Sequence, residues 1–244
     1  MAGNRRRRAR NITSRDLADY GNPSSGEVDI NAAAAGLGVP ASRISAALGR
    51  ARSALTNTFL RGVSGRQGAD STGAGGPRGL LQAAFGRGPR GGAVDAKAAA
   101  QQLGVSQATV RRWARGTQRP TADHGKALAT AARRVTSTKA GRRSLTADLR
   151  GSAKGIDALK NGAPVWVSGF QGPSKDQATK DDYCRERKVA LRPGPEDIAA
   201  MLAAYEDGGE RGLHQWLTDW ANTGDNYLPG WEFLTIDDLR IGDR

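Results

Sequence analysis

The chain has 244 residues and carries 37 Lys and Arg against 24 Asp and Glu, a formal net charge of +13. Its single cysteine excludes an intrachain disulfide, and no apolar run reaches the roughly 18 to 20 residues that a membrane-spanning helix needs. We therefore expect a cytoplasmic protein without a membrane partner, and the excess of cations predicts a polyanionic partner.

The positive charge is concentrated in one part of the chain. Residues 1–160 hold 28 Lys and Arg against 9 Asp and Glu, a net charge of +19, whereas residues 161–244 hold 9 against 15, a net charge of −6. A chain of this length accommodates two domains of ordinary size. We expect the basic part to bind the polyanion and the acidic part to stay away from it.

The first 92 residues are expected to contain two segments without a fixed structure. Residues 1–26 combine clustered arginine with Gly, Asn, Pro and Ser, which predicts a basic disordered arm. Residues 62–92 are rich in glycine with scattered arginine, which is typical of a flexible linker. Between them, residues 27–61 contain LGVPASRISAALGRAR, a pattern that predicts a helix-turn-helix-like helical segment.

Residues 93–160 contain a stronger pattern of the same kind, LGVSQATVRRWARGTQRP. A helix-turn-helix needs a residue with positive φ in its tight turn and a small residue where its two helices cross. Gly104 and Ala100 meet these needs, and Ser106 is suited to cap the second helix. We therefore predict a helix-turn-helix DNA-binding domain over residues 93–160. The apolar residues expected between its helices are Ala99, Leu103, Val105, Val110 and Trp113.

The second of these helices is expected to present side chains that suit contact with DNA. Glutamine can bond adenine through two hydrogen bonds, arginine can bond guanine, and an alanine methyl can contact thymine. The alternative is an ordinary helical hairpin with a solvated basic face. The side chains expected to face outward are Gln107, Ala108, Thr109, Arg111, Arg112 and Arg115.

The two patterns align as copies of one module. With an offset of 66 residues, VDINAAAAGLGVPASRISAAL and VDAKAAAQQLGVSQATVRRWA agree at eight of 21 positions. The first copy offers few side chains that distinguish bases, so we expect it to hold phosphates through Arg43, Arg50 and Arg52. Two alternatives remain open, namely two unrelated alanine-rich helices or a first copy used for dimerisation or packing. Minor-groove or backbone contacts are expected from the arm residues Arg5, Arg6, Arg7 and Arg8.

Residues 161–244 are expected to form an acidic α+β domain. Strands are expected over Pro164–Phe170, Arg187–Pro193 and Trp231–Leu239. A helix should begin at Pro195 and end at Gly208 and Gly209, and a second helix should carry His214 on its surface. The fold class is therefore a mostly α-helical helix-turn-helix DNA-binding region followed by a small α+β C-terminal domain.

We expect the protein not to be an enzyme, and we expect no metal or cofactor of its own. The two histidines and one cysteine lack the spacing of a zinc site, and the chain contains neither a P-loop nor a G-x-S-x-G motif. The acid pairs Asp181-Asp182 and Asp237-Asp238 are of a type that can hold Mg²⁺, but adjacent acids on surface turns are usually solvated. No catalytic residue is therefore assigned.

Two family resemblances follow from these motifs. The pattern over Leu103–Gly116, followed by a basic turn and Pro120, resembles the lambda-repressor-like class. The order LGVSQATVRRW, basic helical connector, VWVSGFQGP and EFLTIDDLRI resembles the terminal proteins of linear chromosomes and plasmids of actinomycetes, often called telomere proteins. This second resemblance covers roughly Ala93 to Arg244, and residues 1–92 lie outside it. The first resemblance implies base contacts by Gln107, Ala108 and Arg112 and backbone contacts by Thr109 and Arg115.

The second resemblance implies protein-primed replication. Proteins of that family attach covalently to DNA 5′ ends, and a side-chain hydroxyl replaces the 3′-OH of a primer. It implies single- or double-stranded DNA near replicon ends, a DNA polymerase and a telomere-associated recruiting protein as partners, nucleoid association, and Mg²⁺ only through the polymerase.

A priming hydroxyl is expected on an exposed strand end or loop, because a polymerase site must reach it. Ser168 is the first candidate, with Thr179 and Tyr183 as rivals. The alternative function is a sequence-specific helix-turn-helix transcriptional repressor with a C-terminal dimerisation or effector domain. A homodimer is possible in both cases.

Overall fold

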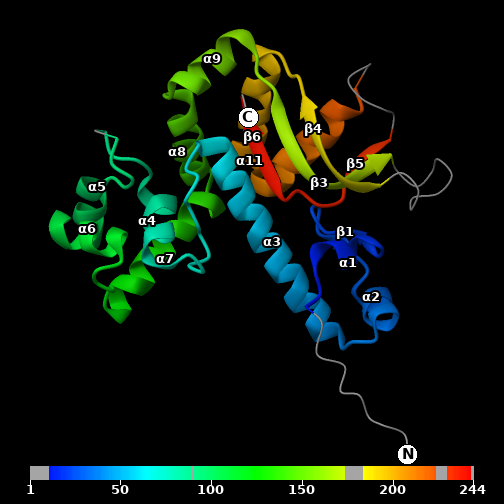
Figure 1. Ribbon diagram of the computed structural model, residues 1–244, viewed down its shortest axis with the longest axis horizontal. Coiled ribbons are helices and arrows are strands. Elements are labelled where there is room, and N and C mark those ends of the chain that lie inside the picture. The colour runs from blue at the N-terminus through cyan, green and yellow to red at the C-terminus, as the bar shows by residue number, and fades with distance from the viewer. Residues whose placement is uncertain (1–10, 90, 174–183, 224–229, 243–244) are drawn as a thin grey trace, which may run out of the picture.

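Most of the chain is helical, and a small antiparallel sheet forms near its C-terminal end (Figure 1). The computed structural model describes residues 11–89, 91–173, 184–223 and 230–242. Within these ranges, no helix is both long enough and apolar enough to cross a membrane. The helices are α1 (Ser14–Ala18), α2 (Ile30–Leu37), α3 (Ala41–Ser64), α4 (Gly76–Phe85), α5 (Ala96–Leu103), α6 (Gln107–Arg115), α7 (Ala122–Ser137), α8 (Lys139–Arg150), α9 (Ala153–Asn161) and α11 (Pro195–Ala221). The strands are β1 (Gly21–Asn22), β2 (Glu27–Val28), β3 (Val165–Pro173), β4 (Arg185–Leu191), β5 (Trp231–Phe233) and β6 (Asp238–Ile241).

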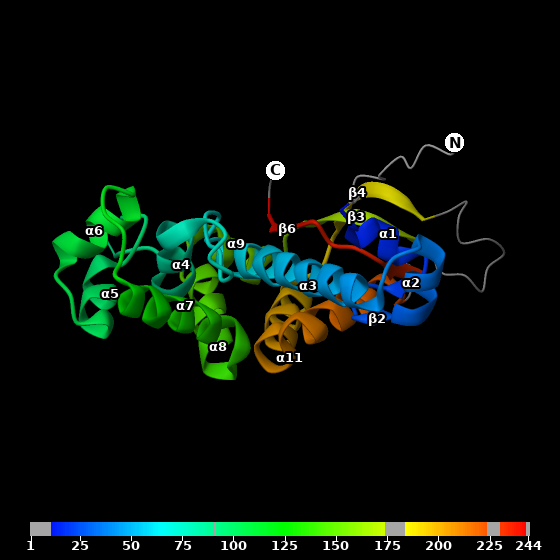
Figure 2. The same cartoon turned by 90° about the horizontal axis from the view of Figure 1, so that it is seen from below.

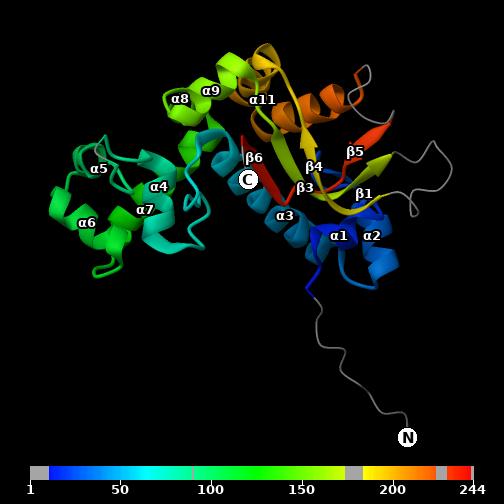
Figure 3. The ribbon, with the colours of Figure 1, turned by 45° about the horizontal axis from the view of Figure 1, so that its top comes forward.

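The sheet is built around β3. Strand β4 pairs with one edge of β3, and β6 and β5 pair with the other edge, all antiparallel. Val167 lies between Val189 and Leu239, and all three side chains are buried in the core shared with α11. Figures 1 and 3 show α11 on this face of the sheet. Because side chains alternate along a strand, Trp166 and Ser168 point to the opposite face.

Helix α11 bends at Gly209, whose φ is 62°, so the helix end that the sequence predicts there is a kink between two helical halves. The expectation that His214 lies on the surface is wrong. Its side chain is 6% exposed, and Nε2 lies 2.9 Å from the carbonyl oxygen of Phe233. The second half of α11 packs against β5, and that contact turns His214 inward.

Residues 11–26 are folded, although the sequence predicts a disordered arm up to residue 26. Thr13 and Asp16 form a reciprocal capping box at the start of α1. Leu17 is fully buried against Ala33 and Ile44, in a small core between α1, α2 and α3. The expectation is wrong here because one capped turn and one leucine anchor the segment to α2 and α3.

The expected flexible linker, residues 62–92, is also largely folded, so that expectation is wrong. It contains α4, whose Leu80 and Leu81 are buried between α4 and its neighbours. Arg66, in the loop before α4, is buried and donates to the carbonyl of Ala83 and to Asp148. The apolar stretch LLQAAF forms an amphipathic helix despite the glycines that surround it.

Helix α3 connects the N-terminal segment to the sheet. Its Gly62 lies so close to β6 that a Cβ there would come within 2.7 Å of Leu239 Cδ2, and Thr58 Oγ1 donates to the carbonyl of Asp237 at 3.2 Å. One apolar core runs from Leu55 of α3 to Ile241 of β6. The boundary expected at residues 160 and 161 therefore does not separate two cores. Figure 2 shows α3 running from the α2 end of the molecule to the helices α4 and α8.

Candidate nucleic-acid interface

Helices α5 and α6 form a short, tightly turned pair. The Asp95 carboxylate accepts hydrogen bonds of 3.0 Å from the backbone amides of Lys97 and Ala98, which caps α5. Gly104 ends α5 with a φ of 66°, as the sequence predicts. Ser106 then caps α6 by accepting from the amide of Thr109 at 3.1 Å. These local signals fix where both helices begin and where α5 ends.

The core of this pair contains the residues that the sequence predicts. Val110 and Trp113 are buried on α6, and the tryptophan ring lies 5.6 Å from the His124 ring of α7, measured between centroids. Of the predicted core residues, Val105 alone is only half-buried. The helix α6 therefore packs against α5 and α4, and Trp113 also contacts α7 through the His124 ring. The remaining buried residues of the pair are Ala99, Ala100 and Leu103.

The outward face of α6 is strongly basic. Arg111, Arg112 and Arg115 are exposed, and none of them forms an ion pair with a carboxylate of the described residues. Gln107 and Ala108 are exposed beside them, and Arg111 Nη2 donates to Gln107 Oε1 at 3.2 Å. Without an ion pair to any described carboxylate, this face presents three positive charges to solvent within nine residues of helix.

Thr109 differs from the other predicted contact residues. It is half-buried, and its hydroxyl lies 2.9 Å from the Ser106 hydroxyl at the cap. Thr109 therefore belongs to the cap at the start of α6 as much as to the outward surface of the helix.

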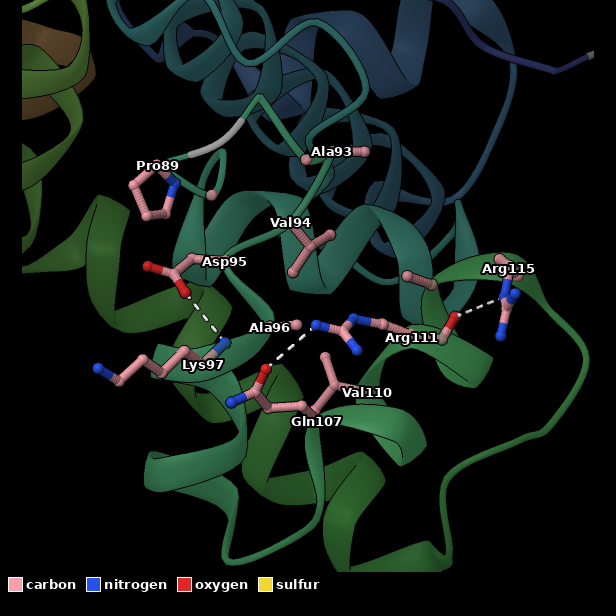
Figure 4. Close-up of a pocket in the computed structure, with 13 residues that line it drawn as sticks. Pro89, Ala93, Val94, Asp95, Ala96, Lys97, Gln107, Val110, Arg111 and Arg115 are labelled. Atoms are coloured by element: carbon pink, nitrogen blue, oxygen red, sulfur yellow. Dashed lines mark hydrogen bonds between the residues drawn. The ribbon is translucent and has the colours of Figure 1, made fainter.

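A cleft of about 670 Å³ separates α6 from the segment that leads into α5 (Figure 4). Val94 and Val110 contribute apolar surface, and Lys97, Arg111 and Arg115 contribute cations. The only acid that lines it, among the residues described, is Asp95, which is engaged in capping α5. Lys97 was not predicted, since its place beside the cleft follows from the packing of α5 on α6, which leaves no signal in the residue pattern.

The first copy repeats this local structure with different side chains. Asp29 caps α2 through the amides of Asn31 and Ala32 at 2.9 Å, and Gly38 ends it with a φ of 63°. Arg43 is half-buried in the first turn of α3. The positions that correspond to the outward residues of α6 are exposed but uncharged, namely Ala41, Ser42, Ser45, Ala46 and Gly49.

The remaining predicted site residues lie elsewhere. Ser168 is half-buried in the middle of β3, paired with Lys188 on β4 and with Asp238 on β6, so the expectation of an exposed strand end is wrong for it. Residues 1–10 with Arg5 to Arg8, and Thr179, Asp181, Asp182 and Tyr183, lie outside the described residues. In the part of the chain that the structure describes, no group of three or more His, Cys, Asp or Glu side chains is arranged to hold a metal ion.

Asp237 is exposed at the residue level, but partial desolvation of its carboxyl raises its pKa above the ordinary value, against a lowering hydrogen bond from Thr235. Glu186 on β4 has a raised pKa as well, because of its own burial and the nearby Asp237 charge. These two acids lie near the Phe170 end of the sheet, away from α6.

In comparisons with known proteins, no protein family, no curated protein and no solved structure matches the chain.

Proposed function

We propose that the chain binds double-stranded DNA as a helix-turn-helix protein, with α6 in the major groove. The observation that carries this proposal is the row of exposed arginines, without an ion pair among the described residues, on a short helix that packs against α4 and α5 and contacts α7 through Trp113. A major groove about 12 Å wide admits one α-helix with its side chains. The phosphates supply the negative charge that this face lacks.

The proposed contacts divide into two kinds. Gln107, Ala108 and Arg112 contact base edges, because they lie toward the outer face and offer amide, methyl and guanidinium groups. Arg111, Arg115 and Lys97 contact phosphates, since all three border the cleft beside α6, where a DNA backbone would pass. Thr109 is the weakest candidate for a backbone contact, because its hydroxyl already bonds Ser106.

Binding of a labelled duplex, followed by fluorescence anisotropy at low salt, tests this proposal. The variant Arg111→Ala/Arg112→Ala/Arg115→Ala should raise Kd at least tenfold, because three phosphate or base contacts are lost. The control is Arg192→Ala/Arg211→Ala, which removes two exposed arginines far along the chain. Equal affinities of the triple variant and the wild type would remove α6 from the interface.

The cellular role that we propose is that of a protein primer at the ends of a linear replicon, with repression of transcription as the alternative. This role rests on the family resemblance. Among the described residues the candidate acceptor is Ser168, which lies in mid-strand and not at a strand end, but is half-exposed on the face of the sheet opposite α11, beside the exposed Lys188. In the reaction the serine oxygen would attack the α-phosphorus of a deoxynucleoside triphosphate, pyrophosphate would leave, and the hydroxyl proton would pass to a base in the polymerase site.

A labelling reaction separates the two roles. The protein is mixed with a cell extract that supplies polymerase, a linear template and one labelled deoxynucleotide. A primer takes up label that survives boiling in detergent and is lost in Ser168→Ala but kept in the control Ser144→Ala. If Thr179→Ala or Tyr183→Phe removes the label instead, Ser168 is the wrong residue. If the wild type takes no label on any template, the repressor becomes the better proposal.

A further inference from the structure

Two adjoining hollows lie between α3, α7 and the loop that precedes α4. The hollow along α3 has a volume of about 850 Å³, and the hollow against α7 has a volume of about 490 Å³. Ser53 of α3 and Thr72 of the loop line both, so they form one groove, here called the α3–α7 groove. In Figures 1 and 3 the connection from α3 to α4 lies between α7 and α3.

Cations and hydroxyls line the α3–α7 groove over a floor of small residues. Arg50 and Arg61 extend from α3 and Arg133 from α7, and none of these three forms an ion pair within the described residues. Glu210 is the one acid among the described lining residues. The lining has no aromatic or large aliphatic side chain, and it includes Ala46, Gly49, Gly73 and Ala74. Such a surface suits a polyanionic backbone, because it offers charge and hydrogen bonds and allows close approach.

The loop that forms one wall of this groove is held by a partly buried polar network, in which Asn57 and Ser71 are buried. Asp70 accepts hydrogen bonds of 2.8 Å from the Asn57 side chain and from the backbone amide of Thr72. Asn57 Oδ1 in turn accepts from the amide of Ser71 at 2.8 Å. The wall is therefore preformed, so a ligand does not need to order it, and less free energy is lost on binding.

Helix α7 links the groove to the face of α6. His124, near the start of α7, packs on Trp113 of α6, and Arg133 lines the groove nine residues later, about 14 Å along the helix axis. Lys126, Thr130, Arg133 and Ser137 are all exposed, and their spacing of three or four residues puts them on one stripe of the helix. At the α6 end this stripe starts with an exposed acid, Asp123, three residues before Lys126. From Lys126 to Ser137 its described members are cationic or hydroxyl-bearing, and they run into the groove.

We propose that the α3–α7 groove holds the sugar-phosphate backbone of the same DNA duplex that α6 contacts, as a second site without sequence preference. This inference rests on the proposed function, and it assigns a role to the first copy of the module. At the positions where the second copy has Gln107 and Arg111, the first copy has Ala41 and Ser45, and α3 continues into the groove. The first copy therefore contributes a long helix, α3, which lines the groove where the phosphates would lie. The two rows of side chains are each short, about 14 Å from His124 to Arg133 along α7 and about 16 Å from Arg61 to Arg50 along α3, which is roughly four to five base pairs of B-DNA each.

Duplex length provides the test. Fluorescence anisotropy is measured with two labelled duplexes centred on one site selected from a random pool, about 12 and about 24 base pairs long, or one and two helical turns. The full-length wild type should bind the longer duplex roughly tenfold tighter or more. The variant Arg50→Ala/Arg133→Ala should bind the short duplex like the wild type and lose most of the gain on the long one. Its dependence of log K on log salt should be shallower by about 2, since two phosphate contacts are lost.

Arg192→Ala/Arg211→Ala is the control, because it removes the same charge outside the groove. It should still bind the longer duplex more tightly than the short one, as the wild type does. An Arg50→Ala/Arg133→Ala variant that keeps both the full gain and the full salt slope would overturn the inference and leave the proposed function intact. A wild-type chain that binds neither duplex would overturn both.

Discussion

Arg66 Nε donates a 2.7 Å hydrogen bond to Asp148 Oδ2, and this ion pair joins the loop before α4 to α8 across 82 residues of sequence. The arginine side chain is 5% exposed and the aspartate side chain 39%. The guanidinium also donates to the carbonyl of Ala83, at the end of α4. A single buried cation therefore fixes the position of α4, on which α6 rests.

Removal of the aspartate should destabilise the protein more than removal of the arginine. Asp148→Ala leaves a buried, unpaired guanidinium, and we expect a loss of about 2 to 3 kcal/mol in the free energy of unfolding, below the roughly 3 to 5 kcal/mol typical of a fully buried pair. Arg66→Met keeps most of the apolar stem and leaves a carboxylate that water reaches, so it should cost less. Urea unfolding at neutral pH measures both, and the reverse order would contradict this account of the pair.

Two glycines of α3 test the contact between α3 and the sheet. Gly62→Ala should destabilise by about 1 to 3 kcal/mol, because the new Cβ meets Leu239 and the backbone cannot move away freely. Gly49→Ala, on the same helix with open space around it, should instead stabilise by roughly 0.5 to 1 kcal/mol. If thermal unfolding shows the same change for both, α3 does not pack on β6 as described.

His214 should make the stability depend on pH. Burial lowers the pKa of its imidazole in the folded protein, so the folded state resists protonation more than the unfolded state does. The free energy of unfolding is highest above the unfolded-state pKa of about 6.5. It decreases as the pH falls below that value, by up to about 1.4 kcal/mol at pH 5.5. Urea unfolding at pH 7.5 and 5.5 measures the loss, which His214→Gln should abolish. His124→Gln removes the other histidine and should leave the loss in place; a loss that persists in His214→Gln would assign it to another group.

Salt should weaken DNA binding steeply. If about six phosphates are neutralised, log K should fall with log salt at a slope of roughly −5. Arg43→Ala should weaken binding to all sequences alike, because the first copy offers few groups that distinguish bases. A slope near zero would show that few phosphates are neutralised. A loss of sequence preference in Arg43→Ala would show that the first copy also contacts bases.

Local sequence signals predicted the helix pair α5 and α6. The features that the sequence did not predict depend on packing between segments that are far apart in the chain. Gly104, Ser106 and Trp113 act on their immediate neighbours, so their roles follow from spacing. The stretch LLQAAF indicates α4 locally, but the contact of Arg66 with Asp148, which fixes the loop before α4 against α8, leaves no local pattern. The α3–α7 groove was not predicted for the same reason, since its walls come from three separate segments.

The shared core also changes which experiment is informative. A fragment of residues 161–244 would lack the α3 and α8 surfaces that pack against β6 and α11. Its failure to bind DNA would report lost folding as much as lost contacts, so point variants of the full chain are the better test.

Selection from a random-sequence duplex pool tests the central claim most directly, that α6 contacts base edges. The wild-type chain should enrich one motif, and Gln107→Ala and Arg112→Ala should each relax the preference at particular positions of it, by about 1 to 3 kcal/mol of discrimination. Arg192→Ala/Arg211→Ala should enrich the wild-type motif unchanged. If the wild type enriches no motif, or if both α6 variants enrich the same motif with the same preference, α6 does not contact bases and the account is wrong.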